Sequence, residues 1–368
     1  IRDLIVTGVQ TCALPISLMT KMGYSGELDP KFIIPTVIGN DIGNKKKYYI
    51  GDEAITKLKE SKIVSLLYPI KDGVIDKWDL MEKYWELSIF DYLKSQPKED
   101  YFILTEPPLS DPKNRERIAE IFFEKFSVKG LYIGIQSFFS MIGAQVVYDF
   151  KLKRNEEQKD LFKSQTGLLL ESGESKTRIV PICDGFILGS KIKEFPFAGK
   201  EITNFIVQNF KDRKEKINVE DMQYAARDIK KKYCYLSRNI IDEYSKFDRR
   251  EKKDGKLVVN PRFKKLEGVG QISKKPFSID IGYESFLAPE LFFSPEMIDK
   301  KYNQPLDEMI DSTIQACPIN ILPKMYNNII LSGGSTRFKN FNHKLELLLQ
   351  IKVDERLKKH GSKNKIKV

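Results

Sequence analysis

The sequence predicts an α/β fold, and three observations along the chain lead to it. Two apolar segments, Tyr101–Thr105 and Leu131–Ile135, flank an amphipathic segment, which is the order of a parallel β-α-β unit. Leu168–Leu170 and Ile179–Ile182 flank a Gly-bearing polar turn, which indicates a β-hairpin. Asn328–Leu331 runs into a Gly-Gly turn and then a periodic helical segment. The 368 residues are enough for two ordinary domains or one large α/β unit.

Apolar periodicity and capping residues place the other elements. Apolar residues recur every three to four positions between Asp76 and Leu93, which predicts an amphipathic helix. Asp111 can cap a helix that starts at Pro112, because an aspartate oxygen accepts a free amide there and proline suits the first turn. Strands are also expected at 31–35 and 47–51, and helices after Thr203 and over 219–235.

The chain carries a basic surplus that is partly local. Its 62 Lys and Arg residues exceed its 51 Asp and Glu residues, which gives a formal charge of +11. Lysines crowd residues 358–367, as in a solvated tail, and mixed charges at 248–256 indicate an exposed insertion. Because no RNP-like, zinc-finger or homeodomain motif accompanies these charges, nucleic acid is not an expected partner.

Neither a membrane span nor a metal or disulfide framework is expected. Residues 130–148 lack charge over 19 positions, which is the length of a span. Gln136, Gln145 and the glycines within this stretch favour a buried strand that runs into a core helix. The four cysteines form no Cys-x-x-Cys pair and there are only two histidines. A reducing cytosol is therefore the expected compartment.

Two Gly-bearing turns follow apolar strands and are candidate phosphate-binding elements. They are ESGES at 171–175 and SGGST at 332–336. Glycine lets backbone amides approach an anion without a side chain in the way. Gly333 and Gly334 also precede a helix, whose first amides lack partners and attract negative charge. Either turn alone is weak evidence, because a turn of this sequence is more often an ordinary loop.

Longer motifs in the correct order give these turns a context. Four segments resemble signatures of the actin family: YPIKDGVIDKWDLME at 68–82, LTEPPLSDPKNRE at 104–116, RDIKKKYCY at 227–235 and LSGGSTRF at 331–338. Three segments resemble one subgroup of the actin-related proteins: YLKSQPKEDYFILTEPPL at 92–109, GLYIGIQ at 130–136 and KKPFSIDIGYESFLAPELFFSPE at 274–296. The resemblance runs from about residue 19 to residue 349.

The resemblance implies an actin-like ATPase fold of the actin, Hsp70 and hexokinase type, in which two related α/β domains flank a nucleotide cleft. Residues 19–150 would form the first domain and 166–349 the second, with a charged surface insertion at 151–165. Residues 1–18 would be a non-family or artefactual N-terminus, and 350–368 a basic tail in place of the family's C-terminus. Both ends suggest an incomplete or wrongly assembled reading frame.

The resemblance also implies a cofactor and partners. ATP with Mg²⁺ would bind between two phosphate hairpins, one from each domain. The chain would work with actin-related protein 2 and the other subunits of a branching complex, on actin filaments and under nucleation-promoting factors. It would be a cytoplasmic and cytoskeletal nucleation subunit, and not an enzyme beyond slow ATP hydrolysis. Neither nucleic acid nor membrane insertion is implied.

Site residues follow by position from the family's motifs. Thr20 and Lys21 match the end of the first phosphate hairpin, where Lys21 would donate its ammonium to the phosphates. Gln136 is the candidate for orienting an attacking water, and Glu171 would hold Mg²⁺ through water. The further ATP-binding residues implied are Glu171, Ser172, Gly173, Glu174, Lys230, Gly333, Gly334, Ser335, Thr336 and Phe338.

Departures from the family pattern predict a weakened site. ALPISLM at 13–19 stands where the first hairpin has Asp-x-Gly-Thr-Gly, and Ser175 replaces a glycine of the second. Arg178 replaces a histidine near the attacking water, Lys231 a glutamate that contacts the ribose, and Arg337 a methionine near the adenine. Two lost charge-assisted hydrogen bonds would weaken ATP binding about a hundredfold to ten-thousandfold.

Other interpretations remain open. A conventional filament-forming, ATP-hydrolysing actin is the first, and segment 274–296 and the charged insertion near Lys252 argue against it. An actin-related fragment defective in nucleotide binding is the second. A sugar or acetate kinase of the same fold is the third, and it would need a catalytic Asp in a substrate cleft, for which no motif is found.

Overall fold

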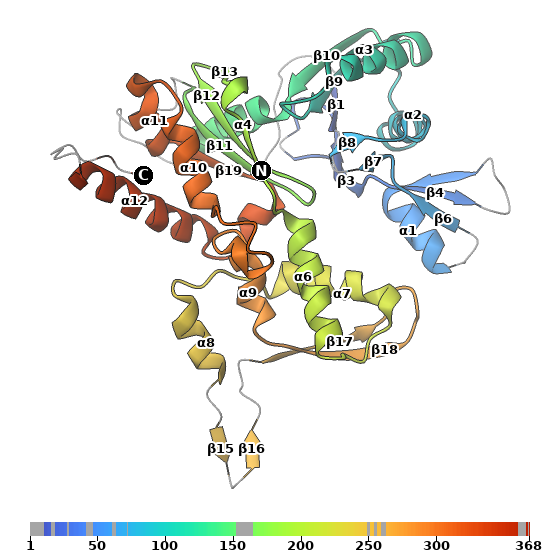
Figure 1. Ribbon diagram of the computed structural model, residues 1–368. Helices are drawn as coiled ribbons and strands as arrows, with labels where there is room; N and C mark the ends of the chain where they lie inside the picture. The colour runs from blue at the N-terminus through green and yellow to red at the C-terminus, as the bar shows by residue number, and fades with distance from the viewer. Residues whose placement is uncertain are drawn as a thin grey trace. The chain divides into compact units, whose positions relative to one another are not determined.

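The computed structural model describes residues 11–15, 19–27, 29–41, 47–60, 64–71, 73–151, 165–248, 251–253, 256–258, 263–359, 366 and 368 (Figure 1). The chain divides into two compact units. Unit 1 comprises residues 1–169 and 182–190, and unit 2 comprises 170–181 and 191–368. The sequence placed the start of a second domain at 166, close to this division.

Unit 1 alternates short strands with helices along the chain. Its elements are β1 (Thr11–Pro15), β2 (Met19–Met22), β3 (Phe32–Pro35), β4 (Ile38–Asp41), β5 (Tyr48–Ile50), α1 (Gly51–Glu60), β6 (Val64–Leu67), β7 (Ile70–Lys71), β8 (Val74–Ile75), α2 (Trp78–Leu87), β9 (Tyr101–Glu106), α3 (Pro112–Glu120), β10 (Gly130–Ile135), α4 (Gln136–Lys151) and β13 (Phe186–Ile187). A π-helical turn extends each of α2 and α3, to Leu93 and Lys125.

The predicted parallel β-α-β unit is confirmed. β9 and β10 pair in parallel, with Tyr101 opposite Gly130 and Glu106 opposite Ile135, and α3 connects them. Asp111 caps α3, because the Lys113 amide donates to its Oδ1 over 3.0 Å. This bond satisfies one of the amides that a helix start leaves free.

A third strand extends this sheet, whose order is β1-β9-β10. β1 pairs in parallel with β9 over all of Thr11–Pro15, which gives the backbone groups on that edge of β9 their partners. Residues 11–15 thus belong to the fold of unit 1. The interpretation of residues 1–18 as a non-family N-terminus did not anticipate this strand.

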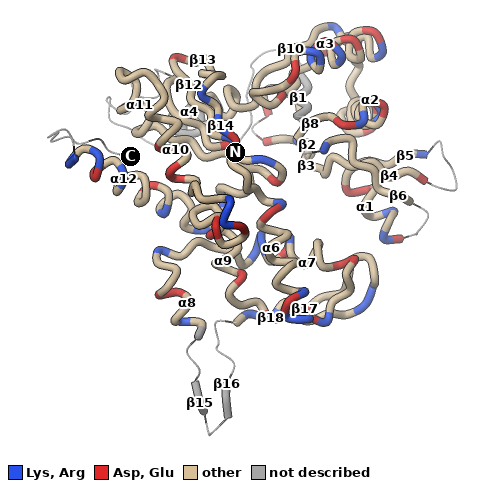
Figure 2. Tube along the Cα trace, viewed as in Figure 1, with Lys and Arg blue, Asp and Glu red and all other residues tan. Residues whose placement is uncertain are grey.

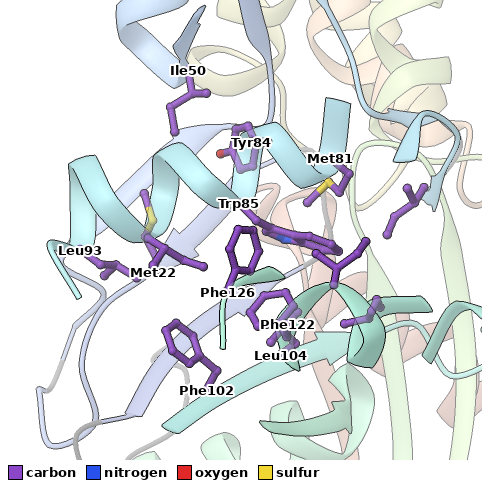
Figure 3. Packing of buried hydrophobic residues seen from close by; sticks show 14 of the residues in the cluster. Met22, Ile50, Met81, Tyr84, Trp85, Leu93, Phe102, Leu104, Phe122 and Phe126 are labelled. Carbon is purple, nitrogen blue, oxygen red and sulfur yellow. The ribbon is translucent and has the colours of Figure 1, made fainter. Parts of the chain in front are cut away.

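The core of unit 1 is an aromatic cluster between the sheet and helices α2 and α3 (Figure 3). Trp85 of α2 meets Phe122 edge-on at 5.2 Å between ring centroids, and Phe122 meets Phe102 of β9 at 5.8 Å. Met22 at the end of β2 is fully buried in the same cluster. Each such side chain contributes about 1.5–3 kcal/mol on burial. The cluster therefore fixes β2, which carries Thr20 and Lys21.

Unit 2 contains the remaining elements. They are β14 (Lys193–Phe195), α6 (Gly199–Asp212), α7 (Val219–Lys232), α8 (Ile240–Asp248), β15 (Glu251–Lys253), β16 (Lys256–Val258), β17 (Lys264–Val269), β18 (Pro276–Ile281), α9 (Glu284–Glu290), α10 (Leu306–Gln315), α11 (Leu322–Asn327), β19 (Ile329–Ser332) and α12 (Phe341–Lys359), with the second half of β11 (Gly167–Ser172) and the greater part of β12 (Thr177–Cys183). The sheet order is β13-β12-β11-β19, and β14 also pairs with β12. The predicted hairpin at 168–182 and the strand-turn-helix at 328–348 are both present.

The C-terminal helix is longer than the sequence suggested. α12 continues past residue 350 to Lys359, and Val353 is 2% exposed. Arg356 forms an ion pair with Asp311 of α10 and donates to the Tyr326 hydroxyl of α11 at 3.0 Å. The basic tail expected at 350–368 thus begins with a packed helix, because these contacts hold residues 350–359 against α10 and α11. Lys358 and Lys359, where the solvated lysine run was expected to begin, are exposed.

The uncharged segment 130–148 and the charged segment near Lys252 form regular secondary structure. Residues 130–148 form β10 and most of α4, so the expected strand and helix are present, but β10 is not the buried strand expected: only Gly134 in it is buried and Tyr132 is 56% exposed. No helix among the described residues has the length and apolar character to cross a membrane. The charged insertion predicted at 151–165 lies almost wholly outside the described residues. The insertion near Lys252 forms the antiparallel pair β15–β16. Along α3, basic and acidic residues are interspersed (Figure 2).

Candidate functional site

The two Gly-bearing turns predicted from the sequence lie against each other in unit 2. They follow β11 and β19, which are neighbours in one sheet. The Ser335 hydroxyl donates to the Gly173 carbonyl over 2.7 Å. Gly333 has a φ of +95°, and a Cβ on it would lie 2.1 Å from the Ser172 carbonyl oxygen. Only glycine can adopt this conformation at this separation, so both turns share one compact structure.

The loop between β11 and β12 is closed at its base. The hydroxyls of Ser172 and Thr177 are 2.6 Å apart and buried, and the Gly173 amide donates to the Lys176 carbonyl at 3.1 Å. Ser175, at the tip of the loop, does not have the positive φ of a left-handed backbone. A serine therefore fits this position without the backbone strain that the loss of a glycine can cause.

Helices α6 and α7 hold the same loop from another direction. The Gly199 amide donates to the Gly173 carbonyl at 2.9 Å, and the Lys200 amide donates to the Glu174 carbonyl at 2.7 Å. Both donors belong to the first turn of α6, whose amides have no partners within the helix. The amides of Glu174 and Ser175 donate to no acceptor among the described residues. The loop thus has the carbonyls of Gly173, Glu174 and Lys176 occupied and two amides available for an anion.

Lys230 of α7 meets the loop at Glu174. Its ammonium donates to Glu174 Oε2 at 2.5 Å and to the Gly199 carbonyl at 2.7 Å, and its side chain is 9% exposed. Arg227 Nε lies 3.8 Å from Glu174 Oε1. Burial lowers the pKa of Lys230, and the charge of Glu174 opposes this change without cancelling it.

Glu171 is the predicted magnesium ligand, acting through water. It lies near the end of β11, is 7% exposed and precedes Ser172, which closes the loop base. Among the described residues, no three His, Cys, Asp or Glu side chains gather as a directly coordinating metal site would require. A cation held at Glu171 would therefore depend on water and phosphate oxygens, as Mg²⁺ commonly does.

The turn after β19 leaves room on one side. A Cβ on Gly334 would meet nothing within 4 Å, and this glycine is exposed. The Thr336 hydroxyl donates to the Gly333 carbonyl at 2.9 Å, which stabilises the turn. Phe338 is half-buried and Arg337 is exposed. An aromatic ring and a guanidinium plane beside an open backbone can both stack on a planar ligand.

The other predicted site residues belong to unit 1. Thr20 is 1% exposed, and its hydroxyl lies 2.8 Å from that of Thr36. Lys21 follows on β2, opposite Ile33 of β3, and is half-buried. Gln136 is the first residue of α4, at the carboxyl end of β10, and its half-buried side chain makes no hydrogen bond to another described residue.

The structure shows the surroundings of two residues that depart from the family pattern, Arg178 and Lys231. Arg178, which replaces a histidine, donates to Glu194 at 2.9 Å and is therefore committed to an ion pair. Lys231, which replaces a glutamate, is exposed. Burial raises the pKa of Glu194, but hydrogen bonds from Lys176 and Arg178 outweigh it and lower the pKa.

Sequence reasoning missed Gly199, Lys200 and Arg227. Gly199 starts α6, and the Ala198 amide before it donates to Glu201 at 2.9 Å, which fixes the helix start. The glycine at a helix start was the available signal, because it indicates a close approach. Taken together, the unit 2 residues fit a phosphate group, because two amides are available and the turns are glycine-bearing.

Comparison with known proteins shows similarity over nearly the whole chain. The sequence model of the Actin family matches residues 16–367, a range that includes residues 350–367. Relatives named "Actin-related protein 3" are similar in sequence: the protein of Caenorhabditis elegans is 39% identical over 357 residues, that of Dictyostelium discoideum 39% over 353 and that of Drosophila melanogaster 38% over 354. Each alignment covers 92% of this chain and 79% of the relative.

Proposed function

Because the chain belongs to the actin family, we propose that it is the actin-related protein 3 subunit of a complex that nucleates branched actin filaments. The observation that carries this proposal is the shared name and the 38–39% identity of its relatives over most of both chains. The segments at 92–109, 130–136 and 274–296 favour the same subgroup. Its partners would be actin-related protein 2, the other complex subunits, actin filaments and nucleation-promoting factors.

The ligand of this subunit is ATP with Mg²⁺. The loop 173–176 supports a phosphate-binding role, because three of its carbonyls, those of Gly173, Glu174 and Lys176, are occupied and its Glu174 and Ser175 amides are available. Glu171 would hold the cation through water, and the turn at Gly333–Thr336 with Phe338 would receive the nucleoside. Thr20 and Lys21 match the family's first hairpin and would be its contribution. Bound Mg-ATP supplies a compact anionic group that amides and ammoniums can hold together.

ATP serves this subunit as a structural and switching ligand, with hydrolysis slow at most. Arg178 supports this view, because its pairing with Glu194 commits it where a base for water activation would be needed. Gln136 would orient a water, and an arginine at position 178 in place of the family's histidine removes the neighbouring base. The place of action is the cytoplasm and the cytoskeleton, including cell projections.

Purification from native cells tests the assignment. The tagged chain, recovered gently, should bring actin-related protein 2 and several non-actin subunits with it in fixed ratio. Recovery as an isolated monomer would contradict the proposal. The rival function, a conventional filament-forming actin, makes the opposite prediction: the purified chain alone would sediment as polymer in Mg-ATP.

A further inference from the structure

We propose that Glu174 is a positioning residue of the nucleotide site: through Lys230 it holds the loop 173–176 in its phosphate-binding shape before any nucleotide arrives. The proposal rests on the proposed nucleotide-binding function. Glu174 and Lys230 are 56 positions apart in sequence, and the carboxylate and the ammonium meet at 2.5 Å. The contact ties the loop to α7.

The Lys230 ammonium joins three segments. It donates to Glu174 on the loop and to the Gly199 carbonyl at the start of α6, while its own backbone belongs to α7. With a side chain only 9% exposed, Lys230 has little water to replace a lost partner. Removal of the Glu174 charge would leave a buried ammonium without its counter-ion, which is costly.

The packing around Gly199 makes this contact specific. A Cβ on Gly199 would lie 2.5 Å from Glu174 Oε2 and 3.0 Å from Lys230 Nζ. The ion pair therefore rests directly on the first residue of α6. This position brings the Gly199 and Lys200 amides to the carbonyls of Gly173 and Glu174.

The direction of two carbonyls sets the direction of two amides. In a trans peptide, the N–H of the next residue points opposite to the C=O before it. Because the Gly173 and Glu174 carbonyls are held by α6, the amides of Glu174 and Ser175 must point away from α6. These are the amides without acceptors among the described residues. Glu174 thus sets the donors that a phosphate group would use, and the ligand need not order them.

Hydrogen exchange of the full chain without nucleotide tests the proposal. In the wild type, the Gly199 and Lys200 amides should be protected. Glu174→Gln keeps the size but removes the charge, and should speed their exchange about tenfold to a hundredfold. Lys230→Met should do the same. The matched control is Glu194→Gln, which removes the ion pairs to Lys176 and Arg178 on the same hairpin and should change the exchange of these amides less than about twofold.

A second measurement separates positioning from general loosening. NMR titration of the Lys230 ε-carbon should show a lower pKa in Glu174→Gln, because the carboxylate that opposes burial is gone. Unprotected amides in the wild type, or unchanged exchange in Glu174→Gln or Lys230→Met, would overturn the proposal. Calorimetric titration with Mg-ATP tests the proposed nucleotide binding independently. If the wild-type chain has protected Gly199 and Lys200 amides but binds no Mg-ATP, the nucleotide assignment is wrong, whereas the role of Glu174 in holding the loop stands.

Discussion

Gly333 and Ser172 approach so closely that no side chain fits between them. A Cβ on Gly333 would lie 2.1 Å from the Ser172 carbonyl oxygen and 3.1 Å from the Ser172 nitrogen, and the φ of Gly333 is +95°. Two segments 161 positions apart in sequence are thus locked backbone to backbone. The relationship explains why the phosphate-binding loop and the turn after β19 form one structure.

Gly333→Ala should destabilise unit 2 strongly. The substitution adds left-handed backbone strain and an overlap with backbone atoms that cannot rotate away, which together cost about 3 kcal/mol or more. Chemical unfolding followed by circular dichroism would measure the loss. Gly334→Ala is the matched control: its Cβ would meet nothing within 4 Å, so we expect a change below about 1 kcal/mol. Equal losses in both variants would contradict the close approach.

Local sequence signals predicted the elements that depend on local chemistry. Asp111 and Pro112 marked the start of α3, and the polar turn after Leu170 marked the hairpin. Gly333 was predicted to allow a close backbone approach, and the structure shows that the backbone of Ser172 makes this approach. These signals succeed because capping and turn formation need only neighbouring residues.

Long-range contacts could not be predicted in the same way. The bond between the Lys200 amide and the Glu174 carbonyl depends on where α6 begins in space, which no residue near either partner encodes. The end of α12 was misjudged because the lysines near residue 358 dominate its composition. Val353 continues the spacing of the buried Leu345 and Leu349 and held the correct signal.

Cysteine reactivity should differ sharply between the described thiols. Cys183 is half-exposed, whereas Cys234 and Cys317 are buried. Burial raises the pKa of the Cys234 thiol, so little reactive thiolate forms there. In a Cys12→Ser background, a maleimide probe at pH 8 should label Cys183 at least about a hundredfold faster than Cys234, because labelling of Cys234 needs local opening. Mass spectrometry of timed digests would show the order, and rapid labelling of Cys234 would contradict its burial.

Asp221 should make the turn between β17 and β18 sensitive to acid. Its carboxylate accepts from the Ile272 amide at 2.8 Å and the Ser273 amide at 3.3 Å. Burial raises the pKa of Asp221, but hydrogen bonds from Ser273 and the turn's amides outweigh it, so the pKa lies below the ordinary 3.8. A lowered carboxyl pKa contributes stability above the unfolded value of 3.8, and that stability is lost as pH falls through the folded pKa.

Asp221→Asn isolates this contribution. At pH 7 we expect the variant to be about 1–3 kcal/mol less stable, because a charge-assisted acceptor is lost. The difference from the wild type should shrink as pH falls below 3.8. Urea unfolding at several pH values measures both quantities. A difference that is constant from pH 7 to pH 3 would show that the charge of Asp221 plays no part.

The last prediction concerns ATP affinity and the first hairpin. The sequence suggested two defects, but Ser175 adopts its backbone conformation without strain and its amide is available, so the second loop retains its donors. One lost charge-assisted hydrogen bond, in the first hairpin, corresponds to about 1.5–3 kcal/mol, or about tenfold to a hundredfold in affinity. Replacing residues 13–19 by a segment with Asp-x-Gly-Thr-Gly should therefore tighten Mg-ATP binding by that factor in calorimetric titration. Ser175→Gly is the matched control and should change affinity less than about threefold, since it restores a glycine where none is required. A larger gain from Ser175→Gly than from the repaired first hairpin would place the defect in the second loop instead.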